Sequence, residues 1–289
     1  MTSIEDFLST FLYYVEQGDP IPIAFSKTKN IKKLKKVNYD NIYEKSRELV
    51  LSYFSLNGRR RSEKIKEFLS NGVRPLLPNW AREELVNYLD VSSLEKSFVN
   101  NTKWIRINTL KTDVDKVILG LEKLGIMIEQ DNDIYYMAKV LSGNIKATEY
   151  YRNFSIIFQD KASSAVVEAL KPENGDLIFD VSSSPGIKAS QISAITENKA
   201  TLVLADMDRR RLHKEIELLR KLGVNMERIN IINQDSSSNS VISADKILFD
   251  APCSSSGIIA NEPSILLKLE KSRILSFSQL QQSILDNIY

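Results

Sequence analysis

The stretch LIFDVSSSPGIKAS, from Leu177 to Ser190, decides the fold class of this chain. It begins with a short apolar run that is typical of a buried strand, and a Ser-Pro-Gly turn then leads into a helical pattern. Three more apolar runs follow and alternate with helical stretches, so the pattern predicts an α/β fold with a parallel, doubly wound sheet. The predicted strands are LIFDV (177–181), TLVLAD (201–206), INIIN (229–233) and KILFD (246–250).

An acidic residue stands at or just after the end of each predicted strand. Ligands of open parallel sheets bind at the carboxyl ends of the strands, near the point where the strand order reverses. After the first strand, Pro185 and Gly186 set the bend, and small serines allow the backbone to approach a ligand. We therefore expect a ligand site at this edge of the sheet. The acids are Asp180, Asp206, Asp235 and Asp250.

Two of these acids suit a ligand that carries adenosine. Asp206 lies about 20 residues beyond the turn, where a carboxylate can accept hydrogen bonds from ribose hydroxyls. Asp235 is placed to receive an adenine amino group. The turn lacks the glycines that cradle a pyrophosphate, so we expect a cofactor without one. The alternative is that these acids cap helices, which explains any one of them more readily than three in register.

Composition excludes several classes of protein. The chain is 43% hydrophobic and 26% charged, and it contains no apolar run near the roughly 18 residues that a bilayer requires. Its first residues, MTSIEDFLST, are acidic and do not resemble a signal peptide, so we predict a cytoplasmic protein without membrane contact. A single cysteine, Cys253, and a single histidine, His213, argue against disulfides and against a zinc site, and no metal is expected.

The N-terminal part differs from the sheet in pattern and in charge. Residues 1–80 hold 14 Lys/Arg against 9 Asp/Glu and have helical periodicity. The segment from Trp104 to Met137 combines strand and helix patterns, as in a small α+β unit. The basic run SKTKNIKKLKKVN (26–38) is expected to be a connector that contacts nucleic acid phosphates or is a solvated surface. The predicted domains are 1–95, 96–153 and 154–289.

Five segments, in order, resemble motifs of the Sun-type RNA cytosine-C5 methyltransferases. DVSSSPGIKAS (180–190) resembles the family's D-x-C-A-A-P-G-G-K-T loop, and DAPCSSSG (250–257) resembles its D-A-P-C-S-G-x-G motif. The segments WIRINTLKT, FQDKASS and QLQQSILDN resemble R-x-N-T-L-K, Q-D-x-A-S and L-Q-x-x-I-L. The resemblance implies a Rossmann-like class I methyltransferase sheet and a small RNA-binding subdomain. More weakly, the first 70 or so residues are similar to a NusB-like helical domain.

The resemblance also implies an activity. The family transfers a methyl group from S-adenosylmethionine to C5 of cytosine in rRNA or tRNA, after a thiolate has added to C6 of an unpaired or extruded base. Carried over by position, Asp250 stabilises the adduct and Cys253 lies in the same catalytic centre. Asp206 and Asp235 hold the ribose and the adenine. The other implied cofactor contacts are Ser182, Ser183, Ser184, Pro185, Gly186, Ile187, Lys188, Arg211 and Asp250.

Three residues of the WIRINTLKT segment are candidate RNA contacts, namely Arg106, Asn108 and Lys111. Arg106 and Asn108 equally suit a role in bracing a domain interface, and the sequence does not separate these roles.

Two departures from the family pattern leave alternatives open. Serines at 182–184 replace Cys-Ala-Ala, and Ile187 replaces a glycine, which we expect to narrow the room for the cofactor. In the family the attacking cysteine belongs to a later Thr-Cys-Ser motif, and the cysteine of the Asp-Ala-Pro-Cys motif assists product release. We therefore expect an incomplete sheet, with the nucleophile on a missing C-terminal segment or on a second chain.

Three alternatives concern the activity and Cys253. The chain could instead be a catalytically silent RNA-binding or ribosome-assembly factor that keeps the methyltransferase fold. Cys253 could itself attack, as the cysteine of a Pro-Cys motif does in the related DNA cytosine methyltransferases. The least favoured interpretation is that Cys253 is only a small buried residue.

Overall fold

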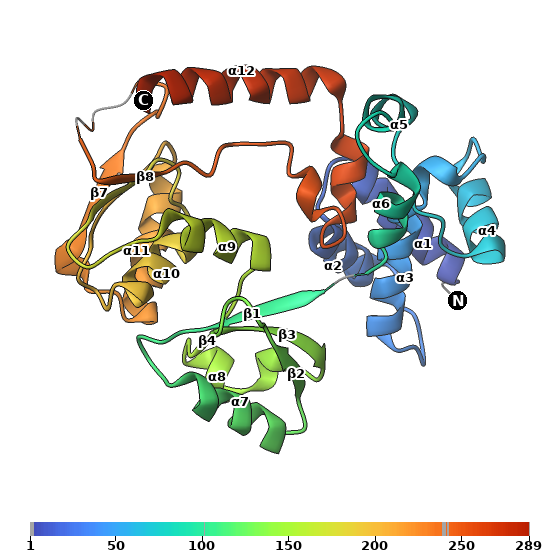
Figure 1. Cartoon of the computed structure of the whole chain (residues 1–289). Coiled ribbons are helices and arrows are strands. Elements are labelled where there is room, and N and C mark those ends of the chain that lie inside the picture. Colours follow the sequence, from blue (N-terminus) through green and yellow to red (C-terminus); the bar gives the residue numbers. More distant parts are fainter. Residues whose placement is uncertain (1–2, 101, 239–240, 242, 289) are drawn as a thin grey trace. The chain divides into compact units, whose positions relative to one another are not determined.

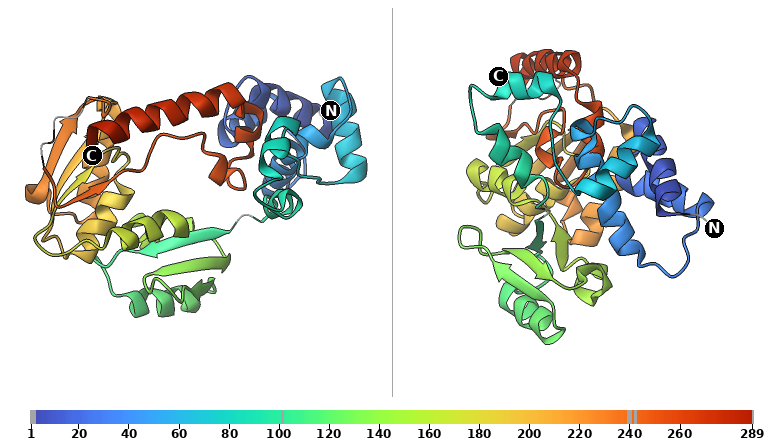
Figure 2. Two further views of the ribbon diagram at one scale, coloured as in Figure 1. Left: turned by 45° about the horizontal axis from the view of Figure 1, so that its top comes forward. Right: turned by 90° about the vertical axis from the view of Figure 1, so that its right-hand side faces the viewer.

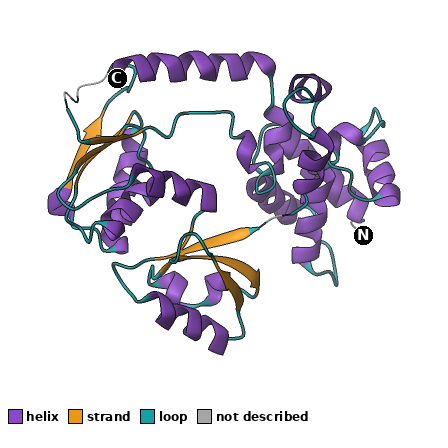
Figure 3. Cartoon of the chain, viewed as in Figure 1, coloured by secondary structure: helices purple, strands orange, loops and turns teal. Residues whose placement is uncertain are grey.

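The computed structural model describes residues 3–100, 102–238, 241 and 243–288 (Figure 3). Contacts divide the chain into two compact units. Figure 1 colours the chain by position in the sequence and labels its helices and strands. The first unit comprises Met1–Asn101 with Cys253–Ser278, and the second comprises Thr102–Pro252 with Gln279–Tyr289. These units differ from the three predicted domains, because residues 253–278 join the helical part and both sheets share one unit. Within the described ranges, no helix has the length and apolar character needed to cross a bilayer.

The first unit is helical. Its first helix, α1 (Ile4–Glu16), packs through Phe7, Phe11 and Val15, which follow helical spacing, and Ser3 caps the N-terminus of α1 by accepting a hydrogen bond from the N–H of Asp6. The helices are α1 (Ile4–Glu16), α2 (Ile21–Ile31), α3 (Tyr39–Leu51), α4 (Arg61–Asn71), α5 (Asn79–Leu85) and α6 (Val91–Ser97). Short 3-10 turns are η1 (Tyr53–Ser55), η4 (Ser256–Ile258) and η5 (Pro263–Lys268). Helix α12 (Lys271–Ile288) has residues in both units.

Helix α2 corrects one prediction. The basic run from residue 26 was expected to be a connector, but its first six residues continue this helix. A proline in the first turn suits a helix start, because its missing N–H would have no helical partner there. Ala24, Phe25 and Thr28 lie on the buried face of α2. This face is hard to recognise in the sequence because lysines stand between and after these residues.

The second unit contains a small antiparallel sheet with the order β2-β3-β1-β4. Its strands are β1 (Lys103–Ile107), β2 (Met127–Gln130), β3 (Met137–Ser142) and β4 (Ile156–Phe158). Helix α7 (Val114–Lys123) packs its buried Val117 and Leu121 against this sheet, while η2 (Ile145–Ala147) and α8 (Glu149–Arg152) precede β4. Strand β3 begins only at Met137, the last residue of the segment in which strand and helix patterns were predicted. Strand β4 extends the sheet beyond the predicted domain boundary at residue 153.

The parallel sheet has the order β7-β6-β5-β8, which confirms the predicted doubly wound topology. Its strands are β5 (Leu177–Asp180), β6 (Thr201–Asp206), β7 (Ile229–Asn233) and β8 (Lys246–Leu248). The connecting helices are α9 (Lys161–Leu170), α10 (Ile187–Ile195) and α11 (Arg209–Leu222), with η3 (Met226–Arg228) before β7. Because β8 adds next to β5 rather than β7, the strand order reverses between β5 and β8.

Both faces of this sheet are covered, as can be followed in Figure 2. Leu202 and Leu204 of β6 pack in one core cluster with Leu219 of α11. On the other face, Phe179 of β5 packs in a second cluster with Ile284 from the C-terminal part of α12. Residues that alternate along β5 and β6 therefore serve opposite faces, and the polar side chains of these two strands stand only at their ends.

Candidate functional site

The strand-end acids lie together at the carboxyl edge of the parallel sheet. Asp180 and Asp206 are the last residues of neighbouring strands β5 and β6, and both are buried, with 2% and 4% of their surface exposed. Asp250 follows β8 by two residues and Asp235 follows β7 by two, and both are exposed. The sheet thus brings the four predicted acids to one edge, at the point where strand order reverses.

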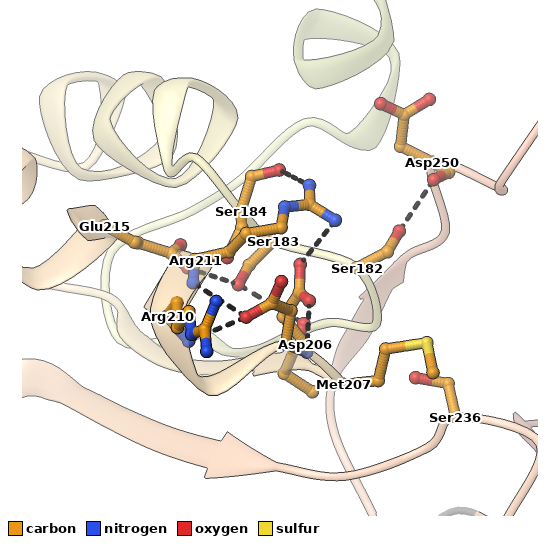
Figure 4. A network of polar contacts seen from close by, with 12 residues as sticks. Ser182, Ser183, Ser184, Asp206, Met207, Arg210, Arg211, Glu215, Ser236 and Asp250 are labelled. Atoms are coloured by element: carbon orange, nitrogen blue, oxygen red, sulfur yellow. Dashed lines mark hydrogen bonds and ion pairs between the residues drawn. The ribbon is translucent and has the colours of Figure 1, made fainter. Parts of the chain in front are cut away.

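The turn after β5 connects two of these strand ends (Figure 4). The N–H of Ser182 donates to Oδ1 of Asp180 over 3.3 Å, and the Ser182 hydroxyl donates to the main-chain oxygen of Asp250 over 2.6 Å. Lys188, in the first turn of α10, forms an ion pair with the carboxylate of Asp250. Three predicted cofactor contacts, Ser182, Lys188 and Asp250, are therefore held in one arrangement.

A second set of contacts ties the same turn to β6. Arg211 of α11 pairs with Oδ2 of Asp206 over 3.2 Å and donates to the main-chain oxygen of Ser184 over 2.6 Å. Oδ1 of Asp206 accepts the N–H of Asp208 over 2.8 Å. The cap of α11 is Asp208, not Asp206, so helix capping does not account for Asp206.

Asp235 has a local role of its own. Its Oδ1 accepts the N–H of Ser237 over 2.9 Å and the Ser237 hydroxyl over 2.7 Å. These hydrogen bonds lower the pKa of Asp235 and keep it ionised. An exposed, ionised carboxylate can still accept a hydrogen bond from an amino group, as predicted for adenine.

A protein-family model matches the part of the chain that contains the parallel sheet. Residues 167–289 match the model of the family described as 16S rRNA methyltransferase RsmB/F. The resemblance to Sun-type RNA methyltransferases is confirmed. The probable ribosomal RNA small subunit methyltransferase B of Bacillus subtilis is 24% identical over 217 residues, which is 73% of this chain and 48% of that protein. The chain spans about half the length of the curated relatives it matches.

Solved structures share the fold. The crystal structure of PH0851 has a TM-score of 0.80 at 18% identity, with 99% of this chain and 83% of that chain covered. NSun6 from Pyrococcus horikoshii has a TM-score of 0.65 at 18% identity, with 73% of this chain and 79% of that chain covered. The Rossmann-like class I methyltransferase fold is therefore confirmed.

The remaining residues of the Sun-type motifs differ in how they are placed. Arg106, on β1, is 1% exposed and donates to Oε1 of Gln159 and to the Ser190 hydroxyl, each over 2.6 Å. Asn108 is equally buried and donates to the main-chain oxygens of Phe154 and Leu222 over 3.1 and 2.9 Å. These bonds join the small sheet to α10 and α11, which favours the bracing role over RNA contact for both residues.

Lys111, the third candidate RNA contact, is exposed but also bonded within the chain. Its Nζ donates to the main-chain oxygens of Asn153 and Lys221 over 2.7 and 2.8 Å. The Lys221 oxygen belongs to the last turn of α11, where a cation is favourable.

Cys253 of the Asp-Ala-Pro-Cys motif is exposed, so the interpretation as a small buried residue is wrong. The N–H of Ser255 donates weakly to its sulfur over 3.4 Å. By its contacts Cys253 belongs to the first unit, whereas Asp250 belongs to the second.

Ile187, which was expected to narrow the room for the cofactor, packs against the core of the parallel sheet. Its side chain is half-buried and packs against the core cluster that includes Val167 and Leu222. The expectation that Ile187 narrows the room for the cofactor therefore has no support in its packing.

Glu215 is a site residue that the sequence reasoning missed. It is fully buried on α11, and its Oε2 accepts the hydroxyls of Ser183 over 2.9 Å and Ser184 over 2.8 Å. One signal was available, because Glu215 stands three residues after Leu212 and four before Leu219, on the apolar stripe of the helix. An acid at such a position needs polar partners in the fold.

Burial raises the pKa of Asp180 to about 7. Repulsion from Glu215 and Asp250 adds to this effect, while the Ser182 N–H and the Lys188 ammonium oppose it. The carboxyl group at the end of β5 thus holds its proton close to neutral pH.

The substitution Asp180→Asn should stabilise the protein at alkaline pH. The folded protein binds a proton at Asp180 up to about pH 7, whereas the unfolded chain releases it near 3.8, so this group's contribution to stability is lost as pH rises between these values. Asparagine cannot ionise, and we expect D180N to exceed the wild type by roughly 1–3 kcal/mol in unfolding free energy at pH 8. Urea unfolding at pH 8 and pH 4 measures this.

At pH 4 the advantage of D180N should disappear, because the wild-type carboxyl is then protonated. The exposed Asp115 of α7 provides the control, and D115N should show no such pH dependence. An advantage of equal size at both pH values would contradict the raised pKa.

Proposed function

We propose that this chain binds S-adenosylmethionine and takes part in methylating C5 of cytosine in RNA, with rRNA favoured over tRNA. The arrangement that carries the proposal is the set of strand-end acids Asp180, Asp206 and Asp250 around a serine turn at the switch point of a parallel sheet. The match of residues 167–289 to a 16S rRNA methyltransferase family supports both the reaction class and the RNA. Small-subunit rRNA methyltransferase relatives favour rRNA in particular.

The residues present fit this cofactor. A buried carboxylate, Asp206, ends a strand next to the turn and can accept the two ribose hydroxyls, while Asp235 can accept the adenine amino group. The turn from Ser182 to Lys188 would hold the methionine part, with Arg211 fixing the turn through Ser184. When bound, the cofactor supplies an electrophilic methyl group.

The acid Asp250 is placed to act on the base. It is exposed, and its carboxylate is oriented by Lys188 while its main chain is held by Ser182. We propose that Asp250 stabilises the cytosine adduct at N3 and the exocyclic amine, as the family resemblance implies. Its neighbour in sequence, Cys253, has an exposed thiol and by the family pattern assists product release.

Basic side chains of the first unit are candidates for RNA phosphate contacts. Lys33, Lys35 and Lys36 follow α2 and are exposed, as are Arg59 and Arg60 before α4. Such residues bind nucleic acid through release of counterions and carry little sequence information.

Calorimetric titration of the purified chain with S-adenosylmethionine tests the proposal. We expect saturable binding with a stoichiometry of one, and S-adenosylhomocysteine should compete for the same site. Absence of binding would favour the second candidate, a catalytically silent RNA-binding or assembly factor, which the altered turn at Ser182–Ser184 motivates. Bisulfite sequencing of total RNA with and without the gene then identifies the modified cytosine.

A trapping experiment decides the role of Cys253. RNA that contains 5-fluorocytosine holds the covalent adduct of this reaction class, and the natural gene product should form it in the presence of S-adenosylmethionine. Cys253 is the single cysteine of the given 289 residues. If the attacking cysteine belongs to a Thr-Cys-Ser motif on a further segment or on a second chain, as the family pattern implies, we expect the adduct to persist in Cys253→Ala. Loss of the adduct in this variant would instead make Cys253 the nucleophile.

A further inference from the structure

The carboxyl group of Glu215 lies next to the turn that follows β5 and accepts hydrogen bonds from it (Figure 4). Both serine hydroxyls of the turn donate to the same oxygen, Oε2, and the residue has no exposed surface. The other oxygen, Oε1, has no hydrogen-bond partner among the described residues. All hydrogen bonds that the described residues make to this carboxyl group therefore come from Ser183 and Ser184.

The backbone of the turn also packs closely on Glu215. Gly186 has a φ of +92°, a conformation that favours glycine, and a side chain at this position would meet Cγ of Glu215 at 2.9 Å. The N–H of Gly186 donates to the main-chain oxygen of Ser183 over 2.8 Å, and the N–H of Ser183 donates to that of Ala205 over 2.9 Å. The turn is thus held by its hydrogen bonds and close packing with Glu215 and by a backbone hydrogen bond to Ala205 of β6.

The charged groups around Glu215 act in opposite directions. Burial raises its pKa, and the nearby Asp206 carboxylate raises it further, whereas the serine hydroxyls and the Arg211 guanidinium lower it. Glu215 in turn raises the pKa of Asp180, at the other end of the turn. Two of these groups, Asp206 and Arg211, also belong to the proposed cofactor site.

We propose that Glu215 is a positioning residue that sets the shape of the cofactor-binding turn through Ser183 and Ser184. The inference rests on the proposed function for its cofactor, but the contacts themselves belong to the free protein. The Sun-type loop usually has Ala-Ala where this chain has Ser183 and Ser184. We treat these two serines and Glu215 as one hydrogen-bonded unit, because the hydroxyls need an acceptor and the buried carboxyl group needs donors.

The role of Glu215 and the two serines can be tested because losing one partner of a buried hydrogen bond costs more free energy than losing both. Removing one partner leaves a buried polar group unsatisfied, while replacing both partners by apolar groups of similar shape is nearly neutral. Glu215→Leu leaves the buried Ser184 hydroxyl without its acceptor and leaves the Ser183 hydroxyl with only a longer bond, 3.3 Å, to the main-chain oxygen of Ala205. The double variant S183A/S184A leaves a buried carboxyl group without donors. The triple variant, S183A/S184A with E215L, removes both sides at once.

Hydrogen–deuterium exchange of the cofactor-free chain measures the turn directly. In E215L and in S183A/S184A we expect the backbone amides at positions 183 and 186 to exchange about tenfold faster than in the wild type, and in the triple variant we expect near wild-type rates. The reference is the amide of Ile107, which donates to Tyr136 in the small sheet and should not change. The matched control is Glu217→Leu, because Glu217 is an exposed glutamate on the same helix.

S-adenosylmethionine affinity provides the second measurement. Each part-substituted variant should bind about tenfold more weakly than the wild type, and the triple variant should recover most of the loss. Unchanged exchange at the turn in E215L, or a triple variant as loose as E215L, would overturn the inference. If the wild type binds no S-adenosylmethionine, the proposed function fails for this chain, and the exchange rates still decide the role of Glu215.

Discussion

Replacing Asp206 with alanine should weaken S-adenosylmethionine binding about 100-fold while the chain stays folded. Asp206 is a buried, strand-end carboxylate beside the turn, and hydrogen bonds to a charged acceptor contribute roughly 1.5–3 kcal/mol each. Two ribose hydroxyls would lose their acceptor together. Arg211 would lose its ion-pair partner but keep its bond to the Ser184 oxygen, so the turn retains support. Calorimetric titration of D206A measures the loss.

Two further variants separate ligand contact from structure. Asp206→Asn keeps an oxygen for the N–H of Asp208 and for one hydroxyl, and it should bind with intermediate affinity. Asp115→Ala removes an exposed carboxylate from α7 and should bind like the wild type. If D206A also binds like the wild type, Asp206 serves only to hold Arg211 and the N–H of Asp208.

The parallel sheet could be predicted because its strands are apolar runs whose ends carry polar residues. LIFD and TLVLAD are buried on both faces, so their composition alone marks them as strands. The position of Asp180, Asp206 and Asp250 on one edge then follows from parallel strand direction.

The parts that were missed depend on partners distant in sequence. Strand β4 is only three residues long and exists because it pairs with β1. The first turns of the basic run are helical because Phe25 finds a buried position in the helical core. Periodicity cannot reveal such partners, since it shows which side of an element is apolar but not what covers it.

The same limit applies to the candidate site. Glu215 was on an apolar stripe, yet its role depends on two serines more than 30 residues earlier in the chain. For Arg106 and Asn108, the sequence allowed two kinds of partner, either RNA or another element of the fold across a domain interface. Only the fold shows that Arg106 bonds to Gln159 and Ser190. It likewise shows that Asn108 bonds to the main-chain oxygens of Phe154 and Leu222.

The substitution Arg106→Ala should lower the free energy of unfolding by about 3 kcal/mol. Burial lowers the pKa of Arg106 only to about 10, so the buried side chain is charged at neutral pH and depends on its hydrogen bonds. Alanine removes those bonds, leaves Gln159 without its donor and opens a cavity between β1 and α10. Urea unfolding measures the change, and Lys103→Ala, at an exposed position of the same strand, is the control.

The salt dependence of RNA binding distinguishes bracing from RNA contact. A bracing arginine changes stability and leaves the slope of binding affinity against salt concentration unchanged, because no phosphate contact is lost. An arginine that contacts phosphate reduces that slope by about one unit while stability stays near the wild type. Since the guanidinium is enclosed by Gln159, Ser190 and the Ile187 oxygen, we expect R106A to lose stability and to keep the slope.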